Sequence, residues 1–328
     1  MGGGSAAKAC ACARSVLVLA AVACAFAAAA QRAAASEILA RDATNVMLRV
    51  NAKGEALVSY TEAGRARKLL AWGAVNAIAP TTARAQVSFR LDYAGGWGKY
   101  RAPSYASSFL NRCRRYDGPA LAWFVAACKA PDGSYWALQS WQRMLPNLGL
   151  APWTRKLGVH ELHLSHWSGE LAKLGIYTDW VYSKHFHHLF GRYTYRGLPV
   201  YGFRSTSTGV PLDSFGRNVF LDTFDSAYGA GWRRENSFLA QTGSGSFCYG
   251  FYPHAPYGGY PDVGTRPEGN GTRYRVTAKG PGVTPLVTWE GAGLPDFEPS
   301  NPAHVALEAR MNTLQRELAG PTGRCRIN

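Results

Sequence analysis

The chain has 328 residues, of which 47% are hydrophobic and 17% charged, and its 36 Lys and Arg outnumber its 21 Asp and Glu to give a formal charge of +15. This length and apolar share can bury one large core or two smaller ones, which excludes global disorder. The sequence has no Gly period, no sustained heptad and only one long apolar run. A collagen, a coiled coil and a polytopic membrane protein are therefore excluded.

The first 35 residues have the pattern of a secretory signal peptide. Lys8 and Arg14 precede an apolar segment at 15–30, and small residues follow up to Ala35. The apolar segment is shorter than a typical membrane span. We therefore predict a secreted or cell-envelope-associated protein with no membrane span after cleavage. Cleavage after Ala30 and a lipid anchor at Cys24 are alternatives.

Cleavage of this signal peptide would remove three basic residues and no acidic one, and it would leave four of the seven cysteines in the mature chain. In an exported protein, four cysteines predict two disulfides. We expect Cys113 to pair with Cys128, because they close a short loop, and Cys248 to pair with Cys325, because this bond would hold the C-terminal tail. Free buried thiols are the alternative.

Alternation of apolar and polar residues predicts strands through most of the remaining chain. Residues 45–72 alternate and turn twice, which is typical of a β-meander. A strand at 86–93 follows, then a short helix at 105–114, then a hairpin in which the turn at 131–133 joins a continuously apolar, buried strand at 119–130 to a strand at 134–143. Further strands are expected at 159–167, 170–182, 185–195, 198–204, 218–224 and 246–252.

The C-terminal part combines a hairpin with the clearest helix signal in the sequence. A Pro/Gly-rich segment at 253–272 is followed by paired strands within 272–290. The helix is expected at 302–318, with Asn301 as its N-cap and Pro302 in its first turn. An apolar stripe along it consists of Leu307, Met311, Leu314 and Leu318.

These elements predict a mainly β fold of antiparallel, sandwich-like sheets with a C-terminal helix and one short internal helix. The expected organisation is a signal peptide at 1–35, an N-terminal β-meander at 36–85, a central aromatic-rich β domain at 86–252, a Pro/Gly-rich loop at 253–272, and a C-terminal hairpin and helix at 273–328 that pack on the central domain.

Motifs for a phosphate-binding loop, a nucleophile elbow or an HExxH zinc site are absent from the sequence. Six of the eight histidines lie between residues 160 and 188. If two-residue turns at 168–169 and 183–184 set the strand register, Asp179 lies opposite His188, and His160 is diagonal to Asp179 on the same face. These three residues could bind a divalent metal, or Asp179 could orient a histidine general base. An exposed charge pair is the alternative.

Aromatic side chains on the other face of these strands could stack on sugars or pack in a core. Loops at 94–101, 205–217 and 227–236 also combine Gly with Trp, Tyr or Arg, as a glycan- or anion-binding surface would. The predicted ligand-binding residues are Trp97, Tyr100, Arg101, Trp180, His187, Trp232 and Arg233.

The leading functional hypothesis is a non-catalytic binding protein for a cell-wall glycan or an anionic envelope polymer. Nucleic acid is disfavoured because the basic residues form no long run. One alternative is a secreted hydrolase or metal-dependent enzyme centred on His160, Asp179 and His188, and another is a structural surface protein without a small ligand. The register places Glu161 and Asp179 on opposite faces, so they are not a glycosidase pair. Asp222, Asp225 and Glu235 remain open as carboxylates of such an enzyme.

Overall fold

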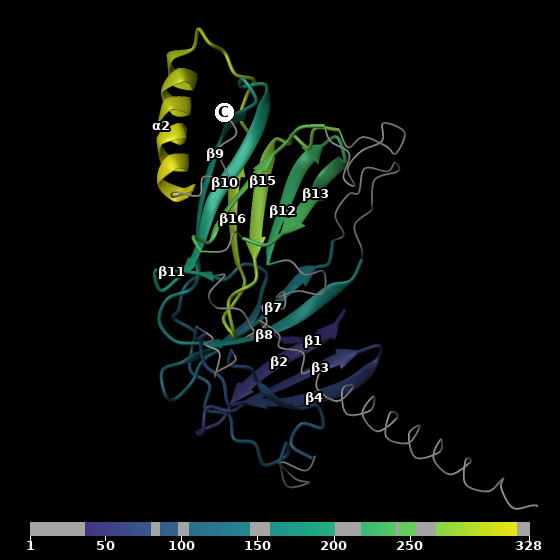
Figure 1. The fold of residues 1–328 in the computed structure, drawn as a ribbon. Coiled ribbons are helices and arrows are strands. Elements are labelled where there is room, and N and C mark those ends of the chain that lie inside the picture. The colour runs from purple at the N-terminus through teal and green to yellow at the C-terminus, as the bar shows by residue number, and fades with distance from the viewer. Residues whose placement is uncertain are drawn as a thin grey trace, which may run out of the picture. The chain divides into compact units, whose positions relative to one another are not determined.

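The computed structural model describes residues 37–79, 86–97, 105–144, 158–200, 218–240, 243–253 and 267–319. These residues form four antiparallel sheets and one helix (Figure 1). The expected mainly β fold of sandwich-like sheets with a C-terminal helix is confirmed. The predicted signal peptide at 1–35 and the loop at 205–217 lie outside the described residues. Within the described ranges, no helix is long and apolar enough to cross a membrane.

Two sheets from the N-terminal half share one core. The β3 sheet has the order β2 (Thr44–Val50), β3 (Ala56–Glu62), β4 (Arg65–Trp72) and β5 (Arg90–Asp92), and the β7 sheet has the order β1 (Glu37–Arg41), β8 (His160–Trp167), β7 (Tyr135–Gln142) and β6 (Phe124–Lys129). Val58 and Leu69 of the β3 sheet belong to the same buried cluster as Trp136, Leu138 and Leu164 of the β7 sheet. Burial of these apolar faces is what stabilises the sheet pair.

Two further sheets share a second core. The β10 sheet contains β9 (Lys173–Val181), β10 (Phe186–Tyr195), β11 (Leu198–Pro199) and β14 (Ser246–Gly250), and the β12 sheet has the order β13 (Gly229–Phe238), β12 (Val219–Ser226), β15 (Arg273–Ala278) and β16 (Val287–Ala292). Leu189, Tyr193 and Phe247 of the β10 sheet pack with Leu221 and Tyr274 of the β12 sheet. Large apolar residues from both sheets therefore fill one interior.

Helix α2 (Pro302–Ala319) begins as its sequence indicates, and its buried side chains are Glu308, Met311 and Gln315. The Asn301 side chain accepts a hydrogen bond from the Ala303 backbone N–H at 3.0 Å, as an N-cap does. Met311 from the apolar stripe is buried. The helix lies beside β9 and β10 (Figure 1), and the Ser246 hydroxyl of β14 donates to the Leu318 carbonyl at 2.9 Å.

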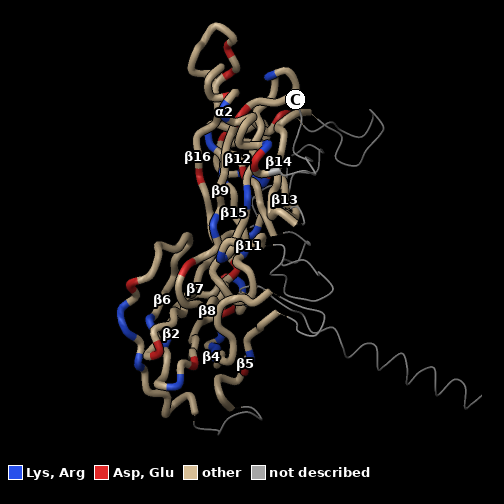
Figure 2. Tube along the Cα trace, turned by 60° about the vertical axis from the view of Figure 1, so that its left-hand side comes forward, with Lys and Arg blue, Asp and Glu red and all other residues tan. Residues whose placement is uncertain are grey.

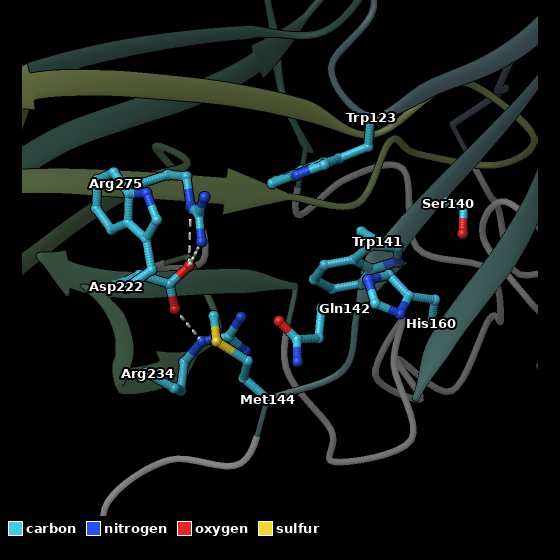
Figure 3. A pocket seen from close by; sticks show the side chains of 10 residues that line it. Trp123, Ser140, Trp141, Gln142, Met144, His160, Asp222, Arg234 and Arg275 are labelled. Carbon is cyan, nitrogen blue, oxygen red and sulfur yellow. Dashed lines mark hydrogen bonds and ion pairs between the residues drawn. The ribbon is translucent and has the colours of Figure 1, made fainter. Parts of the chain in front are cut away.

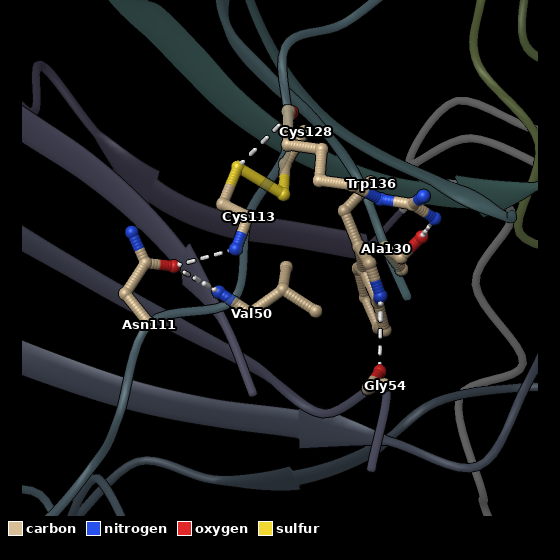
Figure 4. The surroundings of a disulfide bond; sticks show 8 residues. Val50, Gly54, Asn111, Cys113, Cys128, Ala130 and Trp136 are labelled. Carbon is tan, nitrogen blue, oxygen red and sulfur yellow. Dashed lines mark hydrogen bonds between the residues drawn. A yellow bond between two sulfur atoms is a disulfide. The ribbon is translucent and has the colours of Figure 1, made fainter. Parts of the chain in front are cut away.

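The expected helix at 105–114 was wrong. Residues 105–108 form a turn instead, and the backbone that follows makes hydrogen bonds to a neighbouring strand rather than within a helix. The Asn111 side chain accepts hydrogen bonds from the N–H groups of Val50 and Cys113, each at 3.1 Å (Figure 4). The Arg112 N–H donates to the Val50 carbonyl. Bonding to β2 satisfies backbone groups that a helix would have used within itself.

The predicted Cys113–Cys128 disulfide is confirmed. Their Cα atoms lie 5.4 Å apart, and the bond joins the segment before β6 to β6 itself (Figure 4). Arg114 and Lys129 also exchange two backbone hydrogen bonds beside the disulfide. Cys248 is disulfide-bonded as well, whereas Cys325, its expected partner, lies outside the described residues.

The expected hairpin turn at 168–169 was also wrong. Strand β8 pairs with β1 and β7, whereas β9 pairs with β10 in a different sheet. Residues 161–167 are all buried, which suits a central strand covered on both faces rather than a half-exposed hairpin strand. Asn76 holds the chain where it passes from the β7 sheet to the β10 sheet. Its side chain makes hydrogen bonds to both the backbone N–H and the hydroxyl of Ser168, each at 2.9 Å.

Candidate functional site

The structure assembles only two residues of the predicted metal site. Asp179 and His188 are paired across β9 and β10, as the turn at 183–184 predicted, and Asp179 Oδ1 lies 2.6 Å from His188 Nδ1. His160 begins β8 in the β7 sheet and is exposed, because the expected hairpin at 168–169 does not form. Among the described residues, no group of three His, Cys, Asp or Glu side chains could hold a metal ion.

Asp179 and His188 instead form part of a buried polar contact beneath helix α2. Both side chains are fully buried, and the Gln315 side-chain amide donates a hydrogen bond to the second Asp179 oxygen. Glu308 of the same helix is also buried, and burial followed by the nearby Asp179 charge raises its pKa. This pair therefore anchors the helix and does not open to solvent.

The predicted aromatic face around Trp180 and His187 is interior. Both residues are buried opposite one another. The Trp180 indole N–H donates to the Pro295 carbonyl at 3.0 Å, and its ring packs on Phe297. His187 Nδ1 lies 2.6 Å from the Tyr274 hydroxyl. These contacts place the two side chains in the core rather than on a ligand platform.

The remaining predicted ligand-binding residues are dispersed. Trp97 is 59% exposed and follows a turn in which the Gly96 N–H donates to Asp92. Tyr100 and Arg101 lie outside the described residues. The expected loop at 227–236 is mostly strand β13, where Arg233 pairs with Thr223 and Trp232 pairs with Phe224. Alternation along this strand turns Trp232 and Arg233 to opposite faces, and Trp232, but not Arg233, is among the described residues that line the pocket beside this strand.

That pocket, here named the Trp–Arg pocket, is formed by residues of the β7 and β12 sheets. Its volume is about 190 Å³. Figure 3 shows Asp222, Arg234 and Arg275 at one end and Trp141, Gln142 and His160 at the other. The lining residues are Trp123, Ser140, Trp141, Gln142, Met144, His160, Asp222, Trp232, Arg234 and Arg275. His160, predicted as a metal ligand, thus lies in a pocket of different chemistry.

Apolar contacts and hydrogen bonds beneath the pocket hold the two sheets together. Trp141 packs edge-on against Phe220, with ring centroids 5.3 Å apart, and both belong to one buried cluster with Leu286. The Gln139 side chain accepts from the Leu286 N–H at 3.1 Å and donates to its carbonyl at 3.2 Å. The pocket is therefore built on a fixed contact between sheets, as a preorganised site requires.

Asp222 lies between two guanidinium groups. Arg234 Nε donates to one carboxylate oxygen, and Arg275 donates to the other through Nε and Nη2, each at 3.1 Å (Figure 3). The exposed fractions of the Asp222, Arg234 and Arg275 side chains are 1%, 2% and 11%. One carboxylate thus faces two cations in a region largely removed from water, where charges interact more strongly than at the surface.

Trp123 has a strained backbone. Its φ angle is 46°, a left-handed conformation that is rare for a bulky side chain. The Trp123 carbonyl accepts a hydrogen bond from the Ser140 N–H at 2.9 Å, which fixes this conformation at the start of β6. Such strain costs roughly 1–3 kcal/mol and is concentrated at binding and active sites. At this position it directs an indole toward the pocket (Figure 3).

Arginine and aromatic side chains alternate along the face of the β12 sheet. The Arg275 guanidinium lies 5.3 Å from the Trp123 ring centroid and 4.2 Å from that of Trp232. The Arg273 guanidinium lies 5.3 Å from Trp232 and 4.3 Å from Phe224. We name these five residues the Arg–aromatic ladder. Each stacked contact contributes about 0.5–2 kcal/mol, and the larger values apply where water is excluded.

The sequence of β12 contains a signal for this site. Asp222 interrupts the apolar run of β12, and Arg234 and Arg275 lie beside it at registered positions of β13 and β15. A charged residue within a buried strand requires a partner of opposite charge. The sequence alone does not reveal which strands flank β12, so the partners could not be named.

His166, another member of the histidine-rich segment, is a core residue. Its ring stacks on Trp136 with centroids 3.8 Å apart. Nδ1 donates to the Ala74 carbonyl, and Nε2 lies 2.8 Å from the Ser134 hydroxyl. Burial lowers the pKa of His166 to about 4, despite the opposing effects of the Ala74 carbonyl and Asp132. The imidazole is therefore neutral at physiological pH.

The basic residues of the described segments lie in both pairs of sheets. Figure 2 shows Lys and Arg (blue) along many of the described strands, with Asp and Glu (red) between them.

The fold and the site thus define an antiparallel β protein with a compact Trp–Arg pocket. No protein-family model matches the chain, and neither a curated protein nor a solved structure matches it.

Proposed function

We propose that the protein binds a saccharide in the Trp–Arg pocket. A sugar ring has apolar C–H faces and hydroxyl groups around its edge, so it fits an apolar wall with polar groups beside it. Trp123, Trp141 and Trp232 supply the wall. The convergence of two of these indoles, Trp123 and Trp232, on Arg275 beside the buried Asp222 is the observation that supports this function.

The size of the pocket supports one ring rather than a large ligand. Its volume of about 190 Å³ is below the roughly 300–1,000 Å³ of pockets for drug-sized molecules. A single sugar, or one residue of a longer glycan, suits this space. With the predicted export, the natural ligand would be a cell-wall or extracellular glycan.

The charged groups favour binding over hydrolysis. Most glycosidases use two carboxyl groups on either side of the bond that they cleave. Among the described residues that line the pocket, Asp222 supplies the one carboxylate, and two arginines hold it. Asp225 lies apart from this lining and accepts a hydrogen bond from the Gly231 N–H. We therefore propose a non-catalytic site.

Removal of one pocket indole tests the proposal. Trp232→Ala should weaken binding of a saccharide at least tenfold, or about 1.4 kcal/mol, because the ring contributes both the wall and the contact to Arg275. Trp97→Ala is the matched control, because it removes an exposed indole that is not among the lining residues. Isothermal titration calorimetry against neutral and acidic oligosaccharides would measure both affinities.

Two further measurements keep this test independent of folding. Circular dichroism would show whether Trp232→Ala retains the β structure, and Trp232→Phe should recover part of the affinity through its smaller ring. The proposal fails if no oligosaccharide binds to the wild-type protein. It also fails if the Trp97 and Trp232 variants lose affinity equally.

A further inference from the structure

Arg273 has a position and a set of contacts that the pocket alone does not explain. It lies on β15 two residues before Arg275, and its side chain is exposed. Its guanidinium stacks on Phe224 at 4.3 Å and also lies over Trp232 at 5.3 Å. No carboxylate in the described part of the chain pairs with Arg273, whereas Arg275 is bonded to Asp222 and lies 3.8 Å from Glu290.

Stacking fixes the guanidinium without occupying its hydrogen-bond donors. A guanidinium that stacks on an aromatic ring through its flat face keeps its N–H donors in its own plane, free to bind an anion. An arginine held in this way loses less side-chain freedom when an anion binds. Its donors match the two oxygens of a carboxylate, or of a sulfate, in a bidentate arrangement. Arg273 therefore has the chemistry of an anion-binding group.

Trp232 connects this group to the Trp–Arg pocket. It lines the pocket, and its ring also contacts both Arg273 and Arg275. A ligand that occupies the pocket beside Trp232 can thus extend along the Arg–aromatic ladder to Arg273. We infer that the ligand is an acidic saccharide, with a sugar ring in the Trp–Arg pocket and a carboxylate or sulfate held by Arg273. This inference rests on the proposed saccharide-binding function.

The charges around the ladder favour an anion over a cation. Within the pocket, Arg234 and Arg275 face the single carboxylate of Asp222, and Arg273 adds a cation that has no carboxylate partner in the described ranges. The whole chain has a formal charge of +15, and loss of the predicted signal peptide with its three basic residues would still leave an excess of positive charge that attracts acidic polymers at long range. An exposed ion pair by itself is weak, so Arg273 should act together with the pocket and not as a separate site.

Matched acidic and neutral ligands test the inference. We would use trimers of galacturonate, mannuronate and glucuronate, their uncharged methyl esters and a sulfated neutral trisaccharide, titrated into the full chain at low and physiological salt. At least one acidic trimer should bind on the order of tenfold more tightly than its ester. Preference for the sulfated trisaccharide instead would identify sulfate as the anionic group at the same position.

Variants of Arg273 separate local recognition from overall charge. Arg273→Gln should reduce the affinity for the acidic trimer on the order of tenfold and leave the ester unchanged, and Arg273→Lys should recover only part of it because a point charge lacks the planar fork. Arg65→Gln removes the same charge at an exposed position of β4 and should leave both affinities unchanged.

Each outcome distinguishes the inference from the function on which it rests. Equal affinity for acidic and esterified trimers would overturn the inference and leave saccharide binding intact. An equal loss in Arg65→Gln and Arg273→Gln would also overturn it, because only overall charge would then matter. Failure of every saccharide to bind would overturn the proposed function. Tighter, Arg273-dependent binding of a single-stranded oligonucleotide would assign the site to nucleic acid and overturn both.

Discussion

Asp222 is the most sensitive position of the Trp–Arg pocket. Its side chain is 1% exposed and bonds both Arg234 and Arg275, of which Arg234 is almost equally buried. Asp222→Ala would leave two adjacent cations in a largely dry region without their carboxylate. Removal of one partner of a buried ion pair costs about 3–5 kcal/mol. We expect a loss of this size in the free energy of unfolding.

Glu290 supplies the control within the same network. It lies 3.8 Å from Arg275, but its side chain is 48% exposed, so water already solvates the charge. Exposed ion pairs contribute about 0.2–1 kcal/mol. Glu290→Ala should therefore cost at most about 1 kcal/mol. Urea unfolding at pH 7, monitored by circular dichroism, would give the free-energy loss of each variant from the midpoint and slope of its unfolding transition.

A triple variant separates stability from binding. Replacing Asp222 with Leu and both Arg234 and Arg275 with Met removes the three charges that meet at Asp222 and keeps similar volume. Apolar replacement of a whole buried ionic network is often neutral or stabilising. We expect this variant to recover most of the stability lost in Asp222→Ala but to bind no saccharide. The reasoning is refuted if Asp222→Ala costs no more than Glu290→Ala, or if the triple variant is as unstable as the single one.

Two further predictions concern stability away from the pocket. Cys113→Ser combined with Cys128→Ala should lower the free energy of unfolding by about 3 kcal/mol, because the bond closes a loop with a sequence separation of 15, and a urea midpoint unchanged from wild type would contradict this. For His166, burial lowers the pKa from 6.5 to about 4, so the unfolded chain takes up a proton in this interval that the folded protein does not. The contribution of the neutral His166 to the free energy of unfolding is complete above about pH 6.5. It should fall by about 3 kcal/mol as the pH drops to 4. His166→Phe keeps a ring on Trp136 and should flatten this acid dependence in urea unfolding, whereas an unchanged slope would show that other groups cause it.

Short-range signals predicted several details correctly. Ser183 and Lys184 have φ angles of 55° and 68°, as a tight hairpin turn requires, and this turn placed Asp179 opposite His188. Asn301 caps α2 as its position before Pro302 indicated. The Cys113–Cys128 bond joins residues that are close in the sequence. In each case the decisive interaction is local, within a single turn or, for the disulfide, across a sequence separation of 15. The chain boundaries proposed for the domains remain a prediction.

The site depended on long-range pairing that local patterns do not specify. Ser168 and Gly169 have turn composition, yet the chain crosses there from the β7 sheet to the β10 sheet, which separates His160 from Asp179. The same pairing brings Asp222, Arg234 and Arg275 together from three strands.

The sequence by itself determined where most strands begin and end, because side-chain alternation and turn residues act over a few positions. The tertiary structure alone decided which strands are neighbours, because that choice depends on burying both faces of each sheet and pairing every buried charge.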